Sequence, residues 1–226
     1  MKRIIILLLI SQVGLTQSNE GYLIKGKVNG LRDSSLIVLL NGSDGQTIAT
    51  VKAANGAFIF KGKLSEPGIF QVSFTEYKEA VDLFMQNGAI TITGDIKDAR
   101  NIQVKGAALQ EEFLSFKEQF IPYLENLRNL AAQINPEKDT RRRDSLMQLY
   151  NGISGKALNA TLQFTKAKNA SAVSPFVLTV MMPVFRSIND LEATYNELQP
   201  AAKKSVFARM IENNIADAKK KIEDGK

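Results

Sequence analysis

The stretch TIATVKAANGAFIFKG, residues 47–62, decides the fold class of this chain. At its centre lies Asn55-Gly56, a dipeptide that tolerates positive φ at both positions and so favours a tight β-hairpin turn. Phe58 and Phe60 follow two residues apart, which places both rings on one face of a strand. The stretch predicts a strand over 47–51, a turn, and a second strand that carries the two phenylalanines.

The same alternation of apolar and polar residues extends from Tyr22 to Gly106, with turn signals about every eight to twelve residues. About eight short strands are expected, enough for two packed sheets. We expect Leu83 to Met85 to turn at Asn87-Gly88 and pair with the strand of Ile90 and Ile92. The class predicted for residues 19–106 is an antiparallel β-sandwich. Its strands are expected at 23–28, 36–40, 47–51, Phe58 to Phe60, Phe70 to Phe74, 83–85, Ile90 to Ile92, and Ile102 to Val104.

After Gly106 the apolar residues recur every three or four positions, which predicts helices. The strongest stripe contains Pro122, whose missing N–H and ring clash are expected to kink or split the helix. A second helix is expected over 137–168, although Gly152 and Gly155 each cost about 1 kcal/mol relative to alanine. The first stripe consists of Leu109, Phe113, Phe116, Phe120, Leu124, Leu127 and Ala131, and the second of Leu146, Leu149, Ile153, Ala157, Ala160 and Phe164.

Three shorter helices are expected in the rest of the chain. Ser174-Pro175 predicts an N-cap followed by proline at the first helical position, opening an almost wholly apolar segment, 176–185, that must be buried. The whole of 107–226 is therefore predicted to be a helical bundle, which makes the chain α+β. The apolar stripes of the last two helices are Ile188, Leu191, Tyr195 and Leu198, and Phe207, Ile211, Ile215, Ala218 and Ile222.

Residues 1–18 have the layout of a secretory signal peptide. Lys2 and Arg3 precede the apolar run from Ile4 to Ile10, and the sequence turns polar at Thr16. An apolar core that ends near Leu15 is shorter than the about 20 residues that span a bilayer. We therefore expect a soluble, exported protein of a Gram-negative periplasm or outer envelope, with no membrane span after removal of this segment.

The composition excludes several classes of chemistry. The 226 residues include no Cys and no His, so thiolate nucleophiles, disulfides, imidazole bases and zinc sites with nitrogen or sulfur ligands are ruled out. The 29 basic and 23 acidic side chains give a net charge of +6, too small a surplus to indicate a nucleic-acid partner. Carboxylates, hydroxyls, lysines and the backbone remain available for chemistry.

No motif in the chain predicts a catalytic, cofactor-binding or metal-binding residue. Gly21 to Lys27 has phosphate-loop spacing, but Val28 replaces the required hydroxyl and the segment alternates like a strand. Asp95 and Asp98, with Asn101 and Glu66 elsewhere, lack the spacing of a calcium loop and are expected to bond their own turns. The runs 141–143 and 219–221 are interpreted as solvated helix ends. A Ser/Lys dyad can form in space, but the sequence does not locate one.

Several turn and strand motifs, taken in order, resemble a domain of unknown function from Gram-negative bacteria. In that family the domain precedes the thioredoxin-like module of exported thiol:disulfide interchange proteins of the thiol-specific-antioxidant type. The helical region is similar to the family's linker bundle. The likeness rests on Ile24-Lys25-Gly26-Lys27-Val28-x-Gly30, Asn55-Gly56-x-Phe58-x-Phe60-Lys61-Gly62, Glu66-Pro67-Gly68, Asn87-Gly88-x-Ile90-x-Ile92, Val104-Lys105-Gly106, Ser174-Pro175, and Leu191-x-x-x-Tyr195-x-x-Leu198-x-Pro200.

The resemblance implies an accessory role, because the Cys-x-x-Cys module of the family has no counterpart up to Lys226. We expect a non-enzymatic recognition or scaffolding module with a protein partner in the envelope. A second hypothesis is a partner that acts in trans with a separate thioredoxin-like oxidoreductase, or on its substrate. A third is a hydrolase that uses Ser, Lys or carboxylates, which is disfavoured because no nucleophile and base pair is visible in the sequence. No cofactor is expected.

Overall fold

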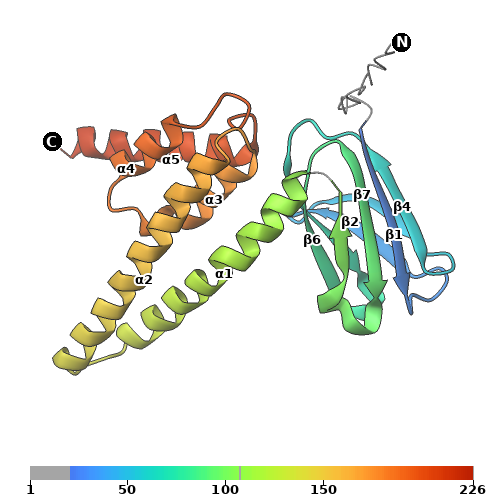
Figure 1. Ribbon diagram of the computed structural model, residues 1–226, viewed down its shortest axis with the longest axis horizontal. Coiled ribbons are helices and arrows are strands. Elements are labelled where there is room, and N and C mark those ends of the chain that lie inside the picture. Colours follow the sequence, from blue (N-terminus) through green and yellow to red (C-terminus); the bar gives the residue numbers. More distant parts are fainter. Residues whose placement is uncertain (1–20, 107, 226) are drawn as a thin grey trace, which may run out of the picture.

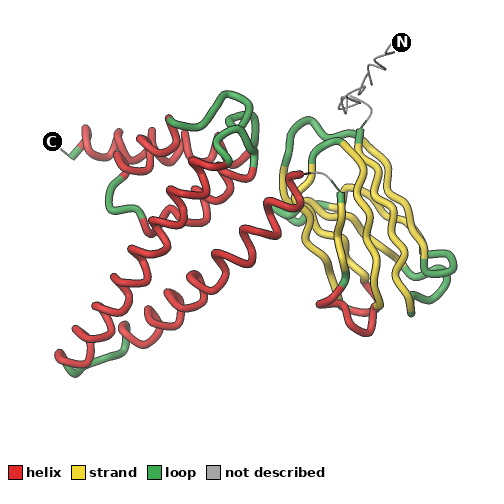
Figure 2. The backbone as a smooth tube through the Cα atoms, viewed as in Figure 1, coloured by secondary structure: helices red, strands yellow, loops and turns green. Residues whose placement is uncertain are grey.

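The computed structural model describes residues 21–106 and 108–225 as two four-stranded sheets followed by a helical region (Figures 1 and 2). The eight strands and five α-helices of this part of the chain confirm the predicted α+β class. The predicted signal peptide, residues 1–18, lies outside the described residues. One sheet, here called sheet A, has the order β4-β1-β7-β8, and the other, sheet B, has the order β3-β2-β5-β6.

Sheet A consists of β1 (Tyr22–Asn29), β4 (Ala57–Gly62), β7 (Gly88–Asp95) and β8 (Gln103–Lys105). Sheet B consists of β2 (Leu36–Asn41), β3 (Thr47–Lys52), β5 (Gly68–Phe74) and β6 (Glu79–Met85). Every pairing is antiparallel except that of β1 with β7, which is parallel. The predicted antiparallel sandwich of about eight strands is confirmed, except that the prediction did not include this one parallel pairing.

The predicted hairpin at Asn87-Gly88 was wrong, because β6 pairs with β5 and β7 lies in the other sheet. The reason is the partner of Asn87. Its side chain accepts a hydrogen bond from the Leu64 N–H at 2.8 Å and donates one to the Leu64 carbonyl at 2.9 Å. The Gly88 N–H donates to the Gly21 carbonyl at 3.0 Å, so the chain crosses from sheet B to sheet A at this point.

The turn at Asn55-Gly56 has the predicted geometry, with φ of 51° and 72°. Ala54 and Ala57 exchange two backbone hydrogen bonds of 2.9 Å across it. The predicted hairpin pairing across this turn was wrong, because β3 pairs with β2 in sheet B and β4 pairs with β1 in sheet A. The turn therefore forms a corner of the sandwich, closed by the single bridge between Ala54 and Ala57. Phe58 packs edge-on against Phe60 and Phe74 between the sheets, each at a centroid distance of 5.9 Å.

The helical region contains α1 (Ala108–Ile134), α2 (Thr140–Ala167), α3 (Val173–Met181), α4 (Ile188–Asn196) and α5 (Val206–Asp224). Short 3-10 helices occur at Thr75–Tyr77 (η1), Ile96–Asn101 (η2) and Met182–Val184 (η3). The two long helices α1 and α2 form an antiparallel hairpin that extends away from the sheets (Figure 1). Side chains of Asp139, Ser187 and Ser205 cap α2, α4 and α5.

Three details of the helices differ from the predictions. The helix α1 continues through Pro122, whose ring is exposed, so of the two predicted outcomes, a kink or a split, the split did not occur. Ser174 lies inside α3 and not at its N-cap, because its hydroxyl donates to the Lys168 carbonyl at 2.7 Å. Leu149 and Ile222 were assigned to buried stripes but are 58% and 54% exposed.

The helices pack on sheet B through Phe84. This side chain of β6 points outward from the sandwich and is fully buried among Phe113, Phe176 and Phe207, at centroid distances of 5.8 to 6.0 Å. Ile69 of β5 lies opposite Phe84 and packs against the same cluster. The sandwich and the helices therefore share one apolar contact on one side of sheet B.

Candidate functional site

A groove lies where the free edges of the two sheets meet the first half of α1. The strand β6 is the last of sheet B and β8 the last of sheet A. Between them and α1 lies a cavity of about 550 Å³. Its walls come from three elements of the sheet region and from one helix. The lining residues are Ala80, Val81, Asp82, Ala99, Arg100, Ile102, Gln103, Val104, Leu114, Lys117 and Glu118.

The outer edge of β6 presents backbone hydrogen-bonding groups to this groove. The Phe84 N–H donates at 2.7 Å to Oε1 of Gln110, a side chain of α1, so it faces away from β5. In an antiparallel pair, the backbone N–H and C=O groups of every second residue face away from the paired strand. On β6 the residues of this set next to Phe84 are Asp82 and Ala80. No strand in the described part of the chain pairs with this edge. The backbone groups of Ala80 and Asp82 are thus available to an added strand.

Gln110 occupies the place that a neighbouring strand would take at the end of this edge. It is fully buried, and its Nε2 has no hydrogen-bond partner in the described part of the chain. A buried donor without a partner carries a cost of about 1–3 kcal/mol. Gln110 lies on the same face of α1 as Leu114 and Lys117, which line the groove, since residues three or four apart are neighbours on a helix.

Charged groups of both signs surround the groove. Lys117 Nζ lies 3.5 Å from Asp82 Oδ2, and the Asp82 carboxylate also accepts a hydrogen bond of 3.0 Å from Gln71. Lys117 Nζ is also 5.7 Å from the centroid of the Phe113 ring. Arg100 and Glu118 add one charge of each sign to the lining. With Leu114 37% exposed, the groove offers backbone, apolar and charged contacts together.

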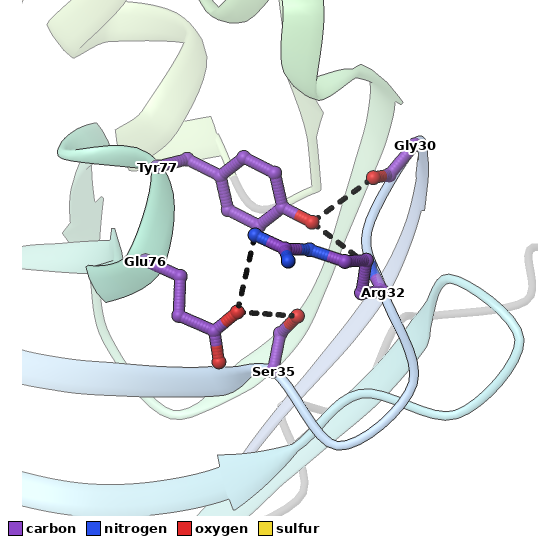
Figure 3. A network of polar contacts seen from close by, with 5 residues as sticks. All are labelled: Gly30, Arg32, Ser35, Glu76 and Tyr77. Atoms are coloured by element: carbon purple, nitrogen blue, oxygen red, sulfur yellow. Dashed lines mark hydrogen bonds and ion pairs between the residues drawn. The ribbon is translucent and has the colours of Figure 1, made fainter.

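A second polar network lies at the end of the sandwich that is formed by η1 and the loop between β1 and β2 (Figure 3). The Tyr77 hydroxyl donates to the Gly30 carbonyl at 3.0 Å and accepts from the Arg32 N–H at 2.9 Å. The hydrogen bond from the Arg32 N–H lowers the pKa of Tyr77. Ser35 donates to Glu76 at 3.4 Å, and Arg32 NH2 lies 3.8 Å from the same carboxylate. The network joins two loops, which gives each of its groups a structural partner.

The structure brings one serine, one glutamate and one lysine together near the junction of sheets and helices. The Ser171 hydroxyl donates to the Glu112 carboxylate, and Lys168 Nζ lies 3.3 Å from the other carboxylate oxygen. Ser171 Oγ also accepts a hydrogen bond of 3.1 Å from the Val173 N–H at the start of α3. These side chains line a cavity of about 470 Å³ with Gln86 and Pro67 of the sheet region. All three groups are engaged in fixing the loop between α2 and α3 to α1.

Of the four polar residues considered together from the sequence, Asp98 and Asn101 bond each other, while Asp95 and Glu66 bond other residues. Asp95 accepts a hydrogen bond from the Lys97 N–H at 2.9 Å, as predicted for a turn aspartate, and Asp98 accepts one from Asn101. Glu66 lies elsewhere, paired with Arg209. Within residues 21–106 and 108–225 no group of three or more Asp or Glu side chains is placed to hold a metal ion.

Two further segments weighed from the sequence have ordinary structural roles. The segment Gly21 to Lys27 enters β1, and residues 141–143 are exposed in the first turns of α2, with Arg142 bonded to Glu137 at 3.1 Å. No helix in the described residues is long and apolar enough to span a bilayer.

The groove itself was not found from the sequence. Its one local signal is Gln110, a polar residue between Leu109 and Phe113 in an apolar stripe. A polar side chain in such a place indicates a specific buried partner. The partner, a backbone N–H of an edge strand, is visible only once the sheet order is known.

Residues 22–113 match a family described as a domain of unknown function, DUF4369. The match covers all eight strands and extends into α1 beyond Gln110, so the edge of β6 and the residue that caps it belong to the same matched segment. No curated protein matches the chain.

Proposed function

We propose that this chain is a non-catalytic recognition module that binds an extended segment of a partner protein by adding a strand to β6. The observation that carries the proposal is the free β6 edge, which faces a groove bounded by β8 and roofed by α1. Edges of this kind pair with added strands through backbone hydrogen bonds, while neighbouring pockets select side chains.

The groove defines which contacts an added strand makes. Its backbone pairs with the N–H and C=O groups of Ala80 and Asp82. Successive side chains of a strand point to opposite faces, so alternate residues face Ile102 and Val104 on one side and Leu114 and Lys117 on the other. The segment bound best is therefore extended and free of proline, with an apolar residue on the side of Ile102.

The non-catalytic part of the proposal is supported by the engagement of the reactive groups. The Ser171 hydroxyl is shared between Glu112 and the start of α3, and Lys168 faces Glu112. Tyr77 and Ser35 are held in the network of Figure 3. A nucleophile needs a base that is free to take its proton, and each of these groups has a structural partner instead.

The setting and the partner are proposed on sequence grounds. The layout of residues 1–18 supports export to the envelope. The resemblance of the turn motifs to the N-terminal domain of thiol:disulfide interchange proteins favours a thioredoxin-like oxidoreductase, or its substrate, as the source of the bound segment. A measured complex with the purified oxidoreductase of the same organism tests this part separately.

The experiment that tests strand addition uses a displayed library of random eight-residue peptides, followed by affinity measurement of the peptides it selects. Ala80→Pro removes one outward N–H without touching the bonds to β5, whereas Ala80→Val at the same position keeps it. We expect Ala80→Pro to weaken binding at least about fivefold and Ala80→Val to leave it within about twofold. Each hydrogen bond lost to an unpaired group costs about 1–3 kcal/mol.

N-methylation of the selected peptide provides the complementary test. Methyl groups on alternate backbone nitrogens should abolish binding in one register and leave it intact in the other, because only every second N–H of an added strand faces β6. Equal loss in both registers, or equal affinity of Ala80→Pro and Ala80→Val in chains that melt normally, would contradict strand addition. A library that yields no binding peptide would contradict it as well.

A further inference from the structure

The outward face of sheet A carries a concentration of lysines. Side chains alternate along β1. Leu23, Lys25 and Lys27 point outward, while Ile24, Gly26 and Val28 are buried. The strand registers place the outward residues of the other strands beside them. We call this surface the lysine face. It consists of Leu23, Lys25, Lys27, Asn29, Ala57, Ile59, Lys61, Ala89, Thr91, Thr93, Asp95, Gln103 and Lys105.

The positive charge of the lysine face is not balanced by carboxylates. Its one acidic side chain is Asp95, opposite Asn29 at the end of β1, and its carboxylate accepts from the Lys97 N–H. Across residues 21–106 and 108–225, no carboxylate lies within ion-pair distance of Lys25, Lys27, Lys61 or Lys105. The Lys27 ammonium donates to the Asn55 carbonyl at 2.5 Å, which keeps it on this face.

An apolar side chain lies among the lysines. Ile59 is 50% exposed and lies directly opposite Lys25, with Lys61 two residues further along β4. Leu23 is opposite Lys61 and half-buried. Lysine stems can lie along such apolar groups while their ammoniums reach outward. The face thus places one exposed apolar side chain, on the edge strand β4, beside the lysines of β1 and β4.

The lysine face is directed away from the helices. Phe84 and Ile69, which contact the helices, are outward residues of sheet B, and sheet A is the other layer of the sandwich. In Figure 1 the strands β1, β4 and β7 are accordingly on the far side of the sandwich from α1 to α5. A partner on the lysine face does not compete with the helical region for space.

We infer that the lysine face docks on an anionic lipid surface. The four lysines lie on β1, β4 and β8, in a sheet whose neighbouring strands are about 4.8 Å apart, and they are not focused into a pocket. Their complement is therefore broad, flat and negatively charged. A bilayer with anionic headgroups has this shape, and its interfacial zone accepts a half-exposed isoleucine between basic side chains. The proposal does not rest on strand addition in the groove on β6, which shares only Gln103 with the lysine face.

The test is sedimentation with vesicles of phosphatidylcholine containing phosphatidylglycerol, compared with phosphatidylcholine alone, using the full chain. The apolar segment of residues 4–10 is common to all variants, so only differences between variants are interpreted. Each lysine near an anionic membrane contributes about fivefold to partitioning. We expect the triple substitution Lys25→Gln, Lys61→Gln, Lys105→Gln to lower partitioning about 100-fold on the anionic vesicles.

A matched control removes the same charge elsewhere. Lys138, Lys156 and Lys220 are exposed in the helical region and take part in none of the described ion pairs. Their triple substitution to Gln should change partitioning less than about threefold. Equal losses in the two triple variants would mean that net charge alone governs binding, and this would overturn the docking of one face.

The orientation can be read directly, because the chain has no cysteine. An environment-sensitive dye on Ile59→Cys should shift to the blue with anionic vesicles, whereas the same dye on Leu149→Cys, in the helical hairpin, should not. The opposite pattern, no binding to anionic vesicles, or binding that soluble dextran sulfate reproduces while vesicles do not, would each overturn the proposal. The last outcome would assign the face to a soluble polyanion.

Discussion

At the scale of single residues, Ser171 shows how one hydroxyl joins separate parts of the chain. Its oxygen accepts from the Val173 N–H at the start of α3, and its hydrogen is donated to Glu112 of α1, 59 residues earlier. Ser171→Ala removes both bonds and leaves a half-buried carboxylate with Lys168 as its remaining described partner. Loss of the hydrogen bond to a charged group, together with the bond from the Val173 N–H, costs about 1–3 kcal/mol.

We therefore expect Ser171→Ala to lower the free energy of unfolding in urea by this amount. Ser145→Ala is the matched control, because the Ser145 hydroxyl is exposed and bonds only the Arg141 carbonyl within its own helix. That variant should stay within about 0.5 kcal/mol of the parent chain. Equal effects of the two substitutions would show that the contact with Glu112 adds nothing to stability.

Hydrogen-bond partners that are distant in the sequence explain why the roles of single residues were predicted only in part. The sequence predicted the turn at Asn55-Gly56 because both residues act locally, through positive φ. It did not predict the role of Asn87, whose side chain bonds Leu64 across 23 residues and not its own turn. Nor could it join Ser171 to Glu112. The local backbone conformation can be predicted from neighbouring residues, but the distant partner of a side chain depends on the completed fold.

At the scale of elements, α1 continues past Pro122, although a proline disfavours the interior of a helix. A proline inside a helix costs about 3 kcal/mol, yet α1 continues for three more turns, held by Leu127 against α2 and by a bond of 2.9 Å from Asn126 to the Pro122 carbonyl. The ring is exposed, so replacing it creates no cavity. Pro122→Ala should restore one backbone bond and raise the free energy of unfolding by roughly 1–3 kcal/mol.

Urea unfolding and hydrogen exchange at residues 118–126 measure this effect. Ala132→Pro, at another exposed position in the last turn of α1, is a control that should destabilise, since a proline there removes a helical bond. If Pro122→Ala instead lowers stability, a bend at this residue is required for packing α1 against α2. That result would restore the kink expected from the sequence.

The elements themselves were predicted well, and their pairing less so. Each strand lies where period-two alternation placed it, because a half-buried strand must bury every second residue. The partners of β6 and β7 were wrong, since alternation gives a strand's faces and not its neighbours. The groove on β6 was missed for the same reason. An edge is a property of sheet order, and that order is set by the crossing at Asn87.

At the scale of the whole molecule, one ion pair crosses from the sandwich to the last helix. Both Glu66 oxygens accept hydrogen bonds of 2.7 Å from Arg209 of α5, and these bonds lower the pKa of Glu66. A carboxyl whose folded pKa is depressed stabilises the folded chain above its unfolded pKa of about 4.3, and this contribution is lost as the pH falls through the folded pKa. Glu66→Gln should therefore be less stable than the parent chain at pH 7, and the difference should disappear as the pH falls through the folded pKa of Glu66.

Thermal unfolding of the two chains between pH 3 and 7 measures this difference. Because both side chains are partly exposed, we expect a gap of at most about 2 °C at neutral pH. Arg209→Gln should show the same pH profile, since it removes the other half of the pair. A gap that widens as the pH falls would have the wrong sign and would contradict the role given to Glu66.

The larger link between the two regions is apolar, and it orients the molecule. Phe84 anchors the helices on sheet B near the groove of β6, which leaves the lysine face of sheet A on the opposite side. The lysines were present in the sequence at alternate positions 25 and 27, but their union with Lys61 and Lys105 required the registers of β4 and β8. A chain held by its lysine face would therefore present its helices away from that surface, with the groove at the β8 edge of the face.

This arrangement depends on Phe84, so its removal should separate the two regions as well as weaken them. Phe84→Ala leaves a cavity among Phe113, Phe176 and Phe207 and should cost about 3–5 kcal/mol. Phe60→Ala, at a position fully buried inside the sandwich, should cost a similar amount but act within the sheets.

Hydrogen exchange resolved by segment distinguishes the two variants. In Phe84→Ala the amides of α3 and α5 should lose protection before those of β1 and β2, because the helices lose their contact with sheet B while the sandwich core stays intact. In Phe60→Ala the strands should open first. If both variants lose protection everywhere at the same rate, the sandwich and the helices unfold together as one cooperative unit. That result would contradict the prediction that loss of Phe84 separates the two regions.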